Sequence, residues 1–284
     1  MILSNLRFLE LASTDKVYTP LKSFSDTLLF YYLGSLALTN DGDLLEIGCG
    51  GSTCPLYELS EKSGRLLTIC DLNELFKNTH LTHYKNANVN PIIDNSKNLI
   101  NYEIGPFVYS HVDGDKDFKV TKQDLEYCID NIAVNGIICQ DDYGNNKWPT
   151  ITHVVDQLVH ENKLKFVIIG DSSAWLTTPE YYDYWMNLLS TDREFQVLSW
   201  YVGLQQSAET LSCTENYYFI NCINIGFITG YNVDKLYWRE KHEIKSSCSD
   251  AELEALYDIH KYLFSSRYLQ MPYRMQSIPG YWLN

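Results

Sequence analysis

The chain has 284 residues, of which 45% are hydrophobic and 14% aromatic, and its formal net charge at neutral pH is −14. This length and composition predict one folded domain with a full core, and the negative charge excludes a typical nucleic-acid binder, because phosphate binding draws on clustered Lys and Arg. No apolar run reaches the roughly 18 residues of a membrane-spanning helix. The N-terminus also does not resemble a secretory signal. We therefore expect a cytoplasmic protein that does not bind membranes.

The first predicted element is a helix within residues 16–38, where residues 24–33 have the apolar density of a helix packed on a sheet edge. After it, an apolar run from Leu44 ends in Glu46 and is followed by glycines at positions 48, 50 and 51. This pattern predicts a buried strand, a tight loop and a helix to about Leu59, which Ser52 or Thr53 can cap.

The glycine loop predicts a bound cofactor. The dinucleotide pattern G-x-G-x-x-G fails because Thr53 stands at the third glycine position. Glu46 ends the strand, where a carboxylate suits a cation better than a pyrophosphate. This fits S-adenosylmethionine, which carries an ammonium and a sulfonium, and the pattern resembles motif I of the class I methyltransferases. The alternative is a strand-to-helix turn with incidental glycines. The cofactor contacts expected in this loop are Glu46, Gly48, Gly50, Gly51 and Ser52.

The next two predicted strands also end in polar residues. Residues 64–71 form a buried strand that ends in Asp71, 25 residues after Glu46, which is the length of one strand–helix–strand unit. An acid there is suited to the ribose hydroxyls. Residues 89–93 form a short third strand, and Asp94 and Ser96 follow it toward the expected adenine edge, although such residues also cap helices.

Acidic residues then follow two further strands. The strand at residues 105–112 ends in Asp113-Gly114-Asp115, a helix follows over residues 120–133, and the strand beginning at Ile137 ends in Asp141 and Asp142. Neighbouring parallel strands would bring these acids to one edge of the sheet. Carboxylates that close repel one another unless a cation or proton lies between them, and oxygen ligands without Cys or His favour Mg²⁺.

This acid pattern resembles the macrocin O-methyltransferase family, which comprises metal-dependent sugar O-methyltransferases. The resemblance rests on residues 112–115, on residues 136–143 and on Trp148-Pro149, and it covers roughly residues 43–161. It implies that Asp113, Asp141 and Asp142 bind the metal, that Asp113 also adjoins the cofactor, and that Asp115 is the general base. Some relatives have His at the position of Lys116, which leaves the identity of the base open. The alternatives to Asp115 are His111, His153 and Lys116.

The remaining chain completes the predicted domain. Residues 165–170 are the sixth strand, and residues 217–228 contain an antiparallel seventh. We expect a single domain with a helical cap at 1–40, a core at 41–230, an aromatic insertion at 171–212 that forms either an acceptor lid or a packing helix, and a helical extension at 231–284. The extension, with a helix from Asp250, packs on the domain or on a second subunit of a homo-oligomer.

The sequence thus predicts an α/β, Rossmann-like class I methyltransferase fold: a seven-stranded, mostly parallel sheet with helices on both faces, plus N-terminal and C-terminal helical additions. The expected activity is S-adenosylmethionine-dependent, Mg²⁺-dependent O-methylation of a sugar or diol in a small-molecule or glycan acceptor. Two alternatives stay open. One is a metal-independent methyltransferase, or an enzyme of this fold with another reaction. The other is a nucleotide- or sugar-binding module without turnover.

Overall fold

The computed structural model describes residues 24–73, 84–145, 147–170, 172–202, 204–206 and 218–220. The chain divides into two compact units, residues 19–187 and residues 1–18 with 188–284. In the second unit, the described elements are α7 (Arg193–Val202), β8 (Leu204–Gln206) and β9 (Tyr218–Ile220), and β8 pairs with β9 in antiparallel orientation. The expected helix from Asp250 lies outside the described residues. Among the helices that are described, none has the length and apolarity needed to cross a membrane.

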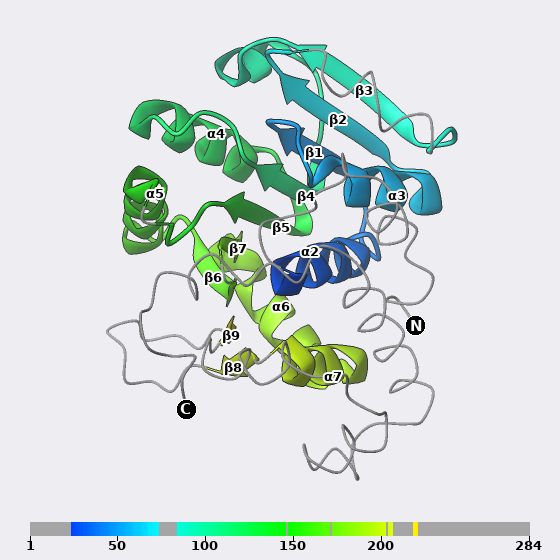
Figure 1. The fold of residues 1–284 in the computed structure, drawn as a ribbon, viewed down its shortest axis with the longest axis vertical. Helices are drawn as coiled ribbons and strands as arrows, with labels where there is room; N and C mark the ends of the chain where they lie inside the picture. Colours follow the sequence, from blue (N-terminus) through cyan, green and yellow to red (C-terminus); the bar gives the residue numbers. More distant parts are fainter. Residues whose placement is uncertain are drawn as a thin grey trace, which may run out of the picture. The chain divides into compact units, whose positions relative to one another are not determined.

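A seven-stranded sheet forms the centre of the larger unit (Figure 1), in the order β3-β2-β1-β4-β5-β7-β6. The pairs β3–β2, β2–β1, β1–β4 and β4–β5 are parallel, whereas β7 is antiparallel to both β5 and β6. The predicted mostly parallel sheet is therefore confirmed. The strands are β1 (Asp43–Ile47), β2 (Leu66–Asp71), β3 (Asn88–Ile93), β4 (Phe107–Val112), β5 (Ile132–Asp141), β6 (Lys165–Ile169) and β7 (Ser173–Thr177).

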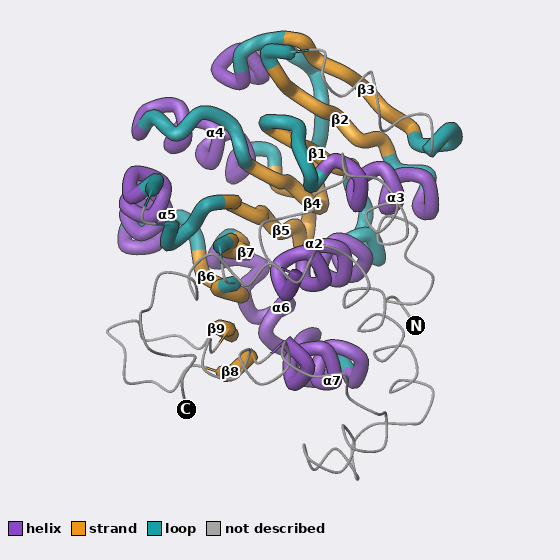
Figure 2. The backbone as a smooth tube through the Cα atoms, in the orientation of Figure 1, coloured by secondary structure: helices purple, strands orange, loops and turns teal. Residues whose placement is uncertain are grey.

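Helices cover both faces of this sheet, as predicted. The helices α2 (Phe24–Ala37) and α3 (Thr53–Ser63) lie on one face, and α4 (Phe118–Asp130) and α5 (Pro149–His160) lie on the other (Figure 2). A short 3-10 helix, η2 (Ser96–Asn101), follows β3, and α6 (Pro179–Thr191) follows β7. This arrangement buries all six residues of the central strand β4, whereas the edge strand β3 is largely exposed.

The antiparallel strand occupies a different place in the sequence from the one predicted. We expected it within residues 217–228, but β7 follows β6 directly, and the Gly170 amide donates to the Ser173 carbonyl at 2.7 Å across the turn. Trp175, which we expected in an aromatic insertion, is fully buried in β7, and its indole nitrogen donates to the Tyr109 hydroxyl at 3.2 Å. Trp185 of α6 is also fully buried. These two aromatic side chains therefore pack in the core.

The boundaries around α4 also differ from the prediction of a helix over residues 120–133. The helix begins at Phe118 because the Asp117 carboxylate caps it, accepting from the Lys119 and Val120 amides. It ends at Asp130 because β5 already begins at Ile132. The strand β5 therefore begins before the predicted Ile137 and includes Asn135, which has φ 58°.

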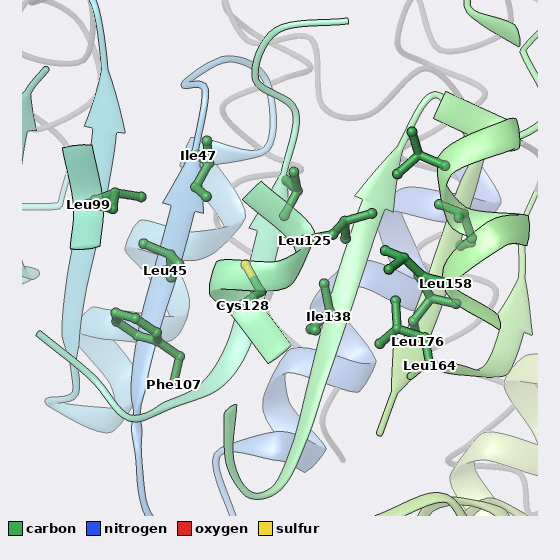
Figure 3. Packing of buried hydrophobic residues seen from close by; sticks show 14 of the residues in the cluster. Leu45, Ile47, Leu99, Phe107, Leu125, Cys128, Ile138, Leu158, Leu164 and Leu176 are labelled. Carbon is green, nitrogen blue, oxygen red and sulfur yellow. The ribbon is translucent and has the colours of Figure 1, made fainter. Parts of the chain in front are cut away.

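The largest described core lies between the sheet and the α4–α5 face (Figure 3). Leu45 and Ile47 of β1 contribute to the same cluster as Leu125 of α4 and Leu158 of α5, and all four side chains are almost completely buried. Burying one such side chain contributes roughly 1.5 to 3 kcal/mol. This packing fixes the strands that end at the candidate site.

Candidate functional site

The glycine loop lies at the carboxyl end of β1, against the loop that follows β4. Gly48 has φ 81°, and a Cβ atom at this position would lie 2.3 Å from the Asp113 carbonyl oxygen. Only glycine tolerates both conditions. Gly50 is exposed, and a Cβ atom there would meet nothing within 4 Å. The loop therefore packs tightly on one side and faces open space at Gly50.

Glu46 lies in β1, two residues before Gly48, and is completely buried. Its Oε1 atom accepts a 2.6 Å hydrogen bond from Ser52 and lies 3.6 Å from Nδ1 of His111, whereas Oε2 has no hydrogen-bond partner. Burial lowers the pKa of His111, but Glu46, Asp113 and Asp141 together outweigh burial, and the pKa lies above its ordinary value. Ser52 and Thr53 were the two predicted cap residues, and Ser52 occupies the N-cap position of α3. Its hydroxyl makes no cap bond and donates to Glu46 instead.

Asp71 lies at the end of β2, as predicted, and connects that strand to the glycine loop. Its Oδ2 atom accepts from the Cys49 amide at 2.8 Å, and its Oδ1 atom accepts from the Asn73 amide at 2.7 Å. The carboxylate is half-buried at the edge of the sheet. It therefore holds the loop in place, and its exposed part remains accessible to a ligand.

The two residues expected at the adenine edge both lie at the start of η2. Asp94 accepts from the Asn98 side chain and the Asn95 amide, each at 2.7 Å, and from the Tyr102 hydroxyl at 3.0 Å. These hydrogen bonds, that of Asn98 first, lower the pKa of Asp94. Ser96 hydrogen-bonds the buried Asp124 of α4. Both predicted residues thus stabilise the turn after β3 in addition to any contact with a cofactor.

The structure brings together the three acids expected to bind a metal. One ligand atom from each of Asp113, Asp141 and Asp142 lies within 4.8 Å of the others. Ser173 donates to Oδ1 of Asp141 at 3.0 Å, and the Asn145 side chain donates to Oδ1 of Asp142 at 2.8 Å. Asp142 adopts φ 61°, an uncommon value for a residue other than glycine. Its turn and these two donors hold the carboxylates beside one another.

This cluster attracts a cation. Burial raises the pKa of Asp113, the charge of Asp141 raises it further, and Lys116 opposes both effects. The Lys116 ammonium contacts Oδ1 of Asp113 and lies 3.1 Å from Oδ2 of Asp142. The cluster therefore already contains one positively charged group, which bridges two of its three carboxylates.

The donor set fits a hard divalent ion. Opposite oxygen ligands of one ion are about 4.2 Å apart for Mg²⁺ and about 5 Å apart for Ca²⁺, twice the metal–oxygen distance. The three carboxylate atoms lie within 4.8 Å of one another, an upper bound that lies between these two values. Because the cluster contains neither Cys nor His, its chemistry agrees with the predicted preference for Mg²⁺.

The predicted catalytic residues differ in accessibility. Asp115 is exposed, and its Oδ1 atom accepts from the Asp117 amide at 3.1 Å. Lys116 is largely buried at the acid cluster. His111 is completely buried, and its ring packs edge-on against Phe30 at 5.0 Å. Of the three, Asp115 is the most open to an acceptor.

Sequence reasoning missed Ser173 and Asn145, which hold the acid cluster. Asn145 follows Asp142 by three residues, a spacing typical of a side-chain-stabilised turn, so the sequence carried a signal for it. The sequence carries no signal for Ser173, because this residue contacts Asp141 only through the antiparallel pairing of β7 with β5.

A cavity of about 790 Å³ lies at the opposite edge of the sheet, where the strands begin. Its lining includes Asn40, Arg65 and Val134. None of the predicted cofactor or metal residues lines it. We therefore place the candidate site by side-chain chemistry, at the carboxyl ends of the strands, where open α/β sheets bind ligands.

Comparisons with solved structures agree with this fold. Cofactor-bound Rv0187 from MTB aligns over 63% of this chain and 93% of its own, at 17% identity and a TM-score of 0.50. CalS11, a TDP-rhamnose 3′-O-methyltransferase of calicheamicin biosynthesis, aligns over 54% and 78%, at 15% identity and a TM-score of 0.45. MycE, from the mycinamycin pathway and in complex with Mg, SAH and mycinamycin VI, aligns over 62% and 54%, at 13% identity and a TM-score of 0.47.

The sequence itself matches a family model. No curated protein matches the chain. A model described as a methyltransferase domain matches residues 45–143, which contain the glycine loop, Asp71 and all three clustered acids. This match and the fold shared with Rv0187 agree with the Rossmann-like methyltransferase fold that the sequence predicted for the larger unit.

Proposed function

We propose that this protein is an O-methyltransferase that uses S-adenosylmethionine and a divalent ion, preferably Mg²⁺, to methylate one hydroxyl of a vicinal diol, as in a sugar. The observation that carries the proposal is the cluster of Asp113, Asp141 and Asp142, whose ligand atoms lie within 4.8 Å of one another beside the glycine loop of a methyltransferase domain. The resemblance of this acid pattern to sugar O-methyltransferases favours a sugar acceptor in a natural product or polysaccharide.

The residues around the glycine loop suit the cofactor. The unpartnered Oε2 atom of Glu46 is a buried acceptor that an ammonium group would satisfy. Gly50 leaves open space beside the loop backbone, and Asp71 presents a half-buried carboxylate for the ribose. Asp94 and Ser96 would flank the adenine. The cofactor supplies the methyl group as an electrophilic carbon bound to a sulfonium.

The acid cluster would hold the divalent ion through Asp113, Asp141 and Asp142. Bound there, the ion would lower the pKa of an acceptor hydroxyl and orient two adjacent oxygens. Ser173 and Asn145 keep Asp141 and Asp142 in position, so that little rearrangement is needed on binding. This preorganisation favours a diol acceptor over a single hydroxyl.

The acceptor proton needs a base, and we assign this role to Asp115. Its carboxylate is exposed in the loop that carries Asp113, whereas His111 is buried and Lys116 donates to the acid cluster. The acceptor oxygen forms a bond to the methyl carbon while the carbon–sulfur bond breaks, and Asp115 receives the proton. S-adenosylhomocysteine and the methyl ether are the products.

One contact favours a second candidate, a metal-independent methyltransferase. The Lys116 ammonium already lies against two of the three acids. If this contact persists throughout turnover, the acids serve to hold the loops around the acceptor and no divalent ion is required. Metal dependence of transfer decides between the two candidates.

Calorimetric titration with S-adenosylhomocysteine tests the cofactor site. Wild type should bind, whereas Glu46→Gln and Asp71→Asn should each weaken binding by roughly 10- to 100-fold, the scale of a lost hydrogen bond to a charged group. Asp130→Asn is the matched control, because Asp130 is exposed at the end of α4, away from the loop. If wild type does not bind the ligand, the proposal is wrong.

A panel of glycosides tests the acceptor and the metal together. The parent diol should be methylated, and removal of either hydroxyl should make a poor substrate, because one compound lacks the nucleophile and the other lacks the second oxygen. Chelator should abolish transfer while S-adenosylhomocysteine binding persists. Transfer that survives exhaustive chelation supports the metal-independent candidate instead.

A further inference from the structure

Lys116 occupies an unusual position for a residue of a metal site. It lies in the short loop between β4 and α4, two residues before α4 begins. Its ammonium bridges Asp113 and Asp142, which come from the ends of two different strands, while Asp141 accepts from Ser173. The side chain is only 18% exposed. The ammonium is therefore part of the acid cluster and not a solvated surface charge.

The ammonium and a divalent ion would compete for the same two carboxylates. An ammonium contacts a carboxylate oxygen at about 2.7 to 2.9 Å, whereas Mg²⁺ binds oxygen at about 2.0 to 2.1 Å, so both cations need the space between these oxygens. Two like charges a few ångströms apart also repel strongly when they are partly buried. Occupation by one cation therefore disfavours occupation by the other.

We propose that Lys116 is a built-in competitor of the divalent ion: its ammonium bridges Asp113 and Asp142 in the ion-free protein and leaves them when the ion binds. This inference rests on the proposed metal site. It assigns to Lys116 the role of setting how tightly that site binds the ion, a role distinct from proton transfer. Ion binding would then also change the position of the Lys116 side chain.

The competition follows from charge more than from shape. Removing the ammonium takes away the positive charge that bridges Asp113 and Asp142, so the three carboxylates within 4.8 Å of one another should bind a divalent ion more tightly. Keeping the charge on a different head group should preserve the competition. The substitutions Lys116→Met and Lys116→Arg separate these two effects, because methionine keeps much of the apolar stem and arginine keeps the charge.

Titration with Mn²⁺, followed by its paramagnetic resonance signal and by calorimetry, tests the inference on the full chain. Lys116→Met should bind Mn²⁺ at least about tenfold more tightly than wild type, and Lys116→Arg should bind no more tightly than wild type. Lys119→Met is the matched control. Lys119 is an exposed residue in the first turn of α4, and this variant should behave like wild type.

Thermal unfolding gives a second measurement, with Lys116→Gln as a second neutral variant. Without the ion, both neutral variants should have a lower melting temperature than wild type. Added Mn²⁺ should raise their melting temperatures more than that of wild type, because a ligand that binds more tightly stabilises the folded state more at the same concentration. Equal or weaker Mn²⁺ binding by both neutral variants would overturn the inference, as would no Mn²⁺ binding by any variant. S-adenosylhomocysteine binding, measured on the same samples, reports separately on the proposed cofactor site.

Discussion

A buried carboxyl on α4 should make the protein less stable as the pH rises. Asp124 is 2% exposed, and its Oδ2 atom has no hydrogen-bond partner. Burial raises the pKa of Asp124 from 3.8 to about 6, against the lowering effect of a hydrogen bond from Ser96, and the charge of Asp115 raises it further. At about 1.4 kcal/mol per pKa unit, ionising this group costs the folded state up to about 3 kcal/mol.

The direction of the effect follows from proton binding. Between pH 3.8 and about 6, the folded state keeps a proton on Asp124 that the unfolded state has lost, so the free energy of unfolding decreases as the pH rises through this window. Above about pH 6, Asp124 is ionised in the folded state as well, so the full loss in the free energy of unfolding is present. Asp124→Asn removes the ionisation and should therefore stabilise the protein at about pH 8 and change little at about pH 4.

Differential scanning calorimetry across this pH range measures the effect. At roughly 2 to 4 °C per kcal/mol for a protein of this size, Asp124→Asn should raise the melting temperature by about 5 to 10 °C at about pH 8. Asp130→Asn, an exposed change on the same helix, should have no pH-dependent effect. A gain from Asp124→Asn that is equal at both pH values would refute the reasoning, because it would not come from ionisation.

Two further predictions concern the loops at the site. Gly48→Ala places a Cβ atom 2.3 Å from the Asp113 carbonyl oxygen, in a residue with φ 81°. This change should lower the free energy of unfolding by about 1 to 3 kcal/mol and abolish most S-adenosylhomocysteine binding. Gly50→Ala is the control and should melt like wild type, because a Cβ atom there meets nothing within 4 Å. Unchanged melting of Gly48→Ala would show that the loop can move away. Ser173→Ala removes the donor to Asp141 and should weaken Mn²⁺ binding several-fold in titration, without affecting S-adenosylhomocysteine binding. Equal Mn²⁺ affinity would mean that Ser173 does not position the acid.

The sequence predicted the strand ends well because their signals are local. An apolar run that meets an acid or a glycine turn reports both a buried strand and its end, and Glu46, Asp71 and Asp113 all lie where this pattern placed them. The same local reasoning failed for Ser52. Ser52 is next to the start of α3, so a cap was the nearest available role, but the buried Glu46 competes for its hydroxyl.

Contacts set by strand pairing were harder to predict. The sixth strand was predicted, but the hairpin from β6 to β7 was not. The segment that forms β7 was assigned to an insertion because it is rich in aromatic residues. The contact of Ser173 with Asp141 depends on that return, since the two residues are paired across β5 and β7. Sequence spacing alone cannot supply such a pair, because it is fixed only once the register of the antiparallel strand is known.

Strand register also explains how the cofactor site and the acid cluster are separated. In the parallel pairs β1–β4 and β4–β5, His111 lies opposite both Glu46 and Cys139. Asp113 and Asp141 each follow by two residues on the same side of their chains, which at about 3.3 Å per residue is a step of about 7 Å along the strands. The sheet thus presents one carboxylate at the level of His111 and a group of carboxylates one step further toward the ligand edge. In the proposed function, the carboxylate at the level of His111 would face the ammonium of the cofactor, and the group of carboxylates would hold the divalent ion.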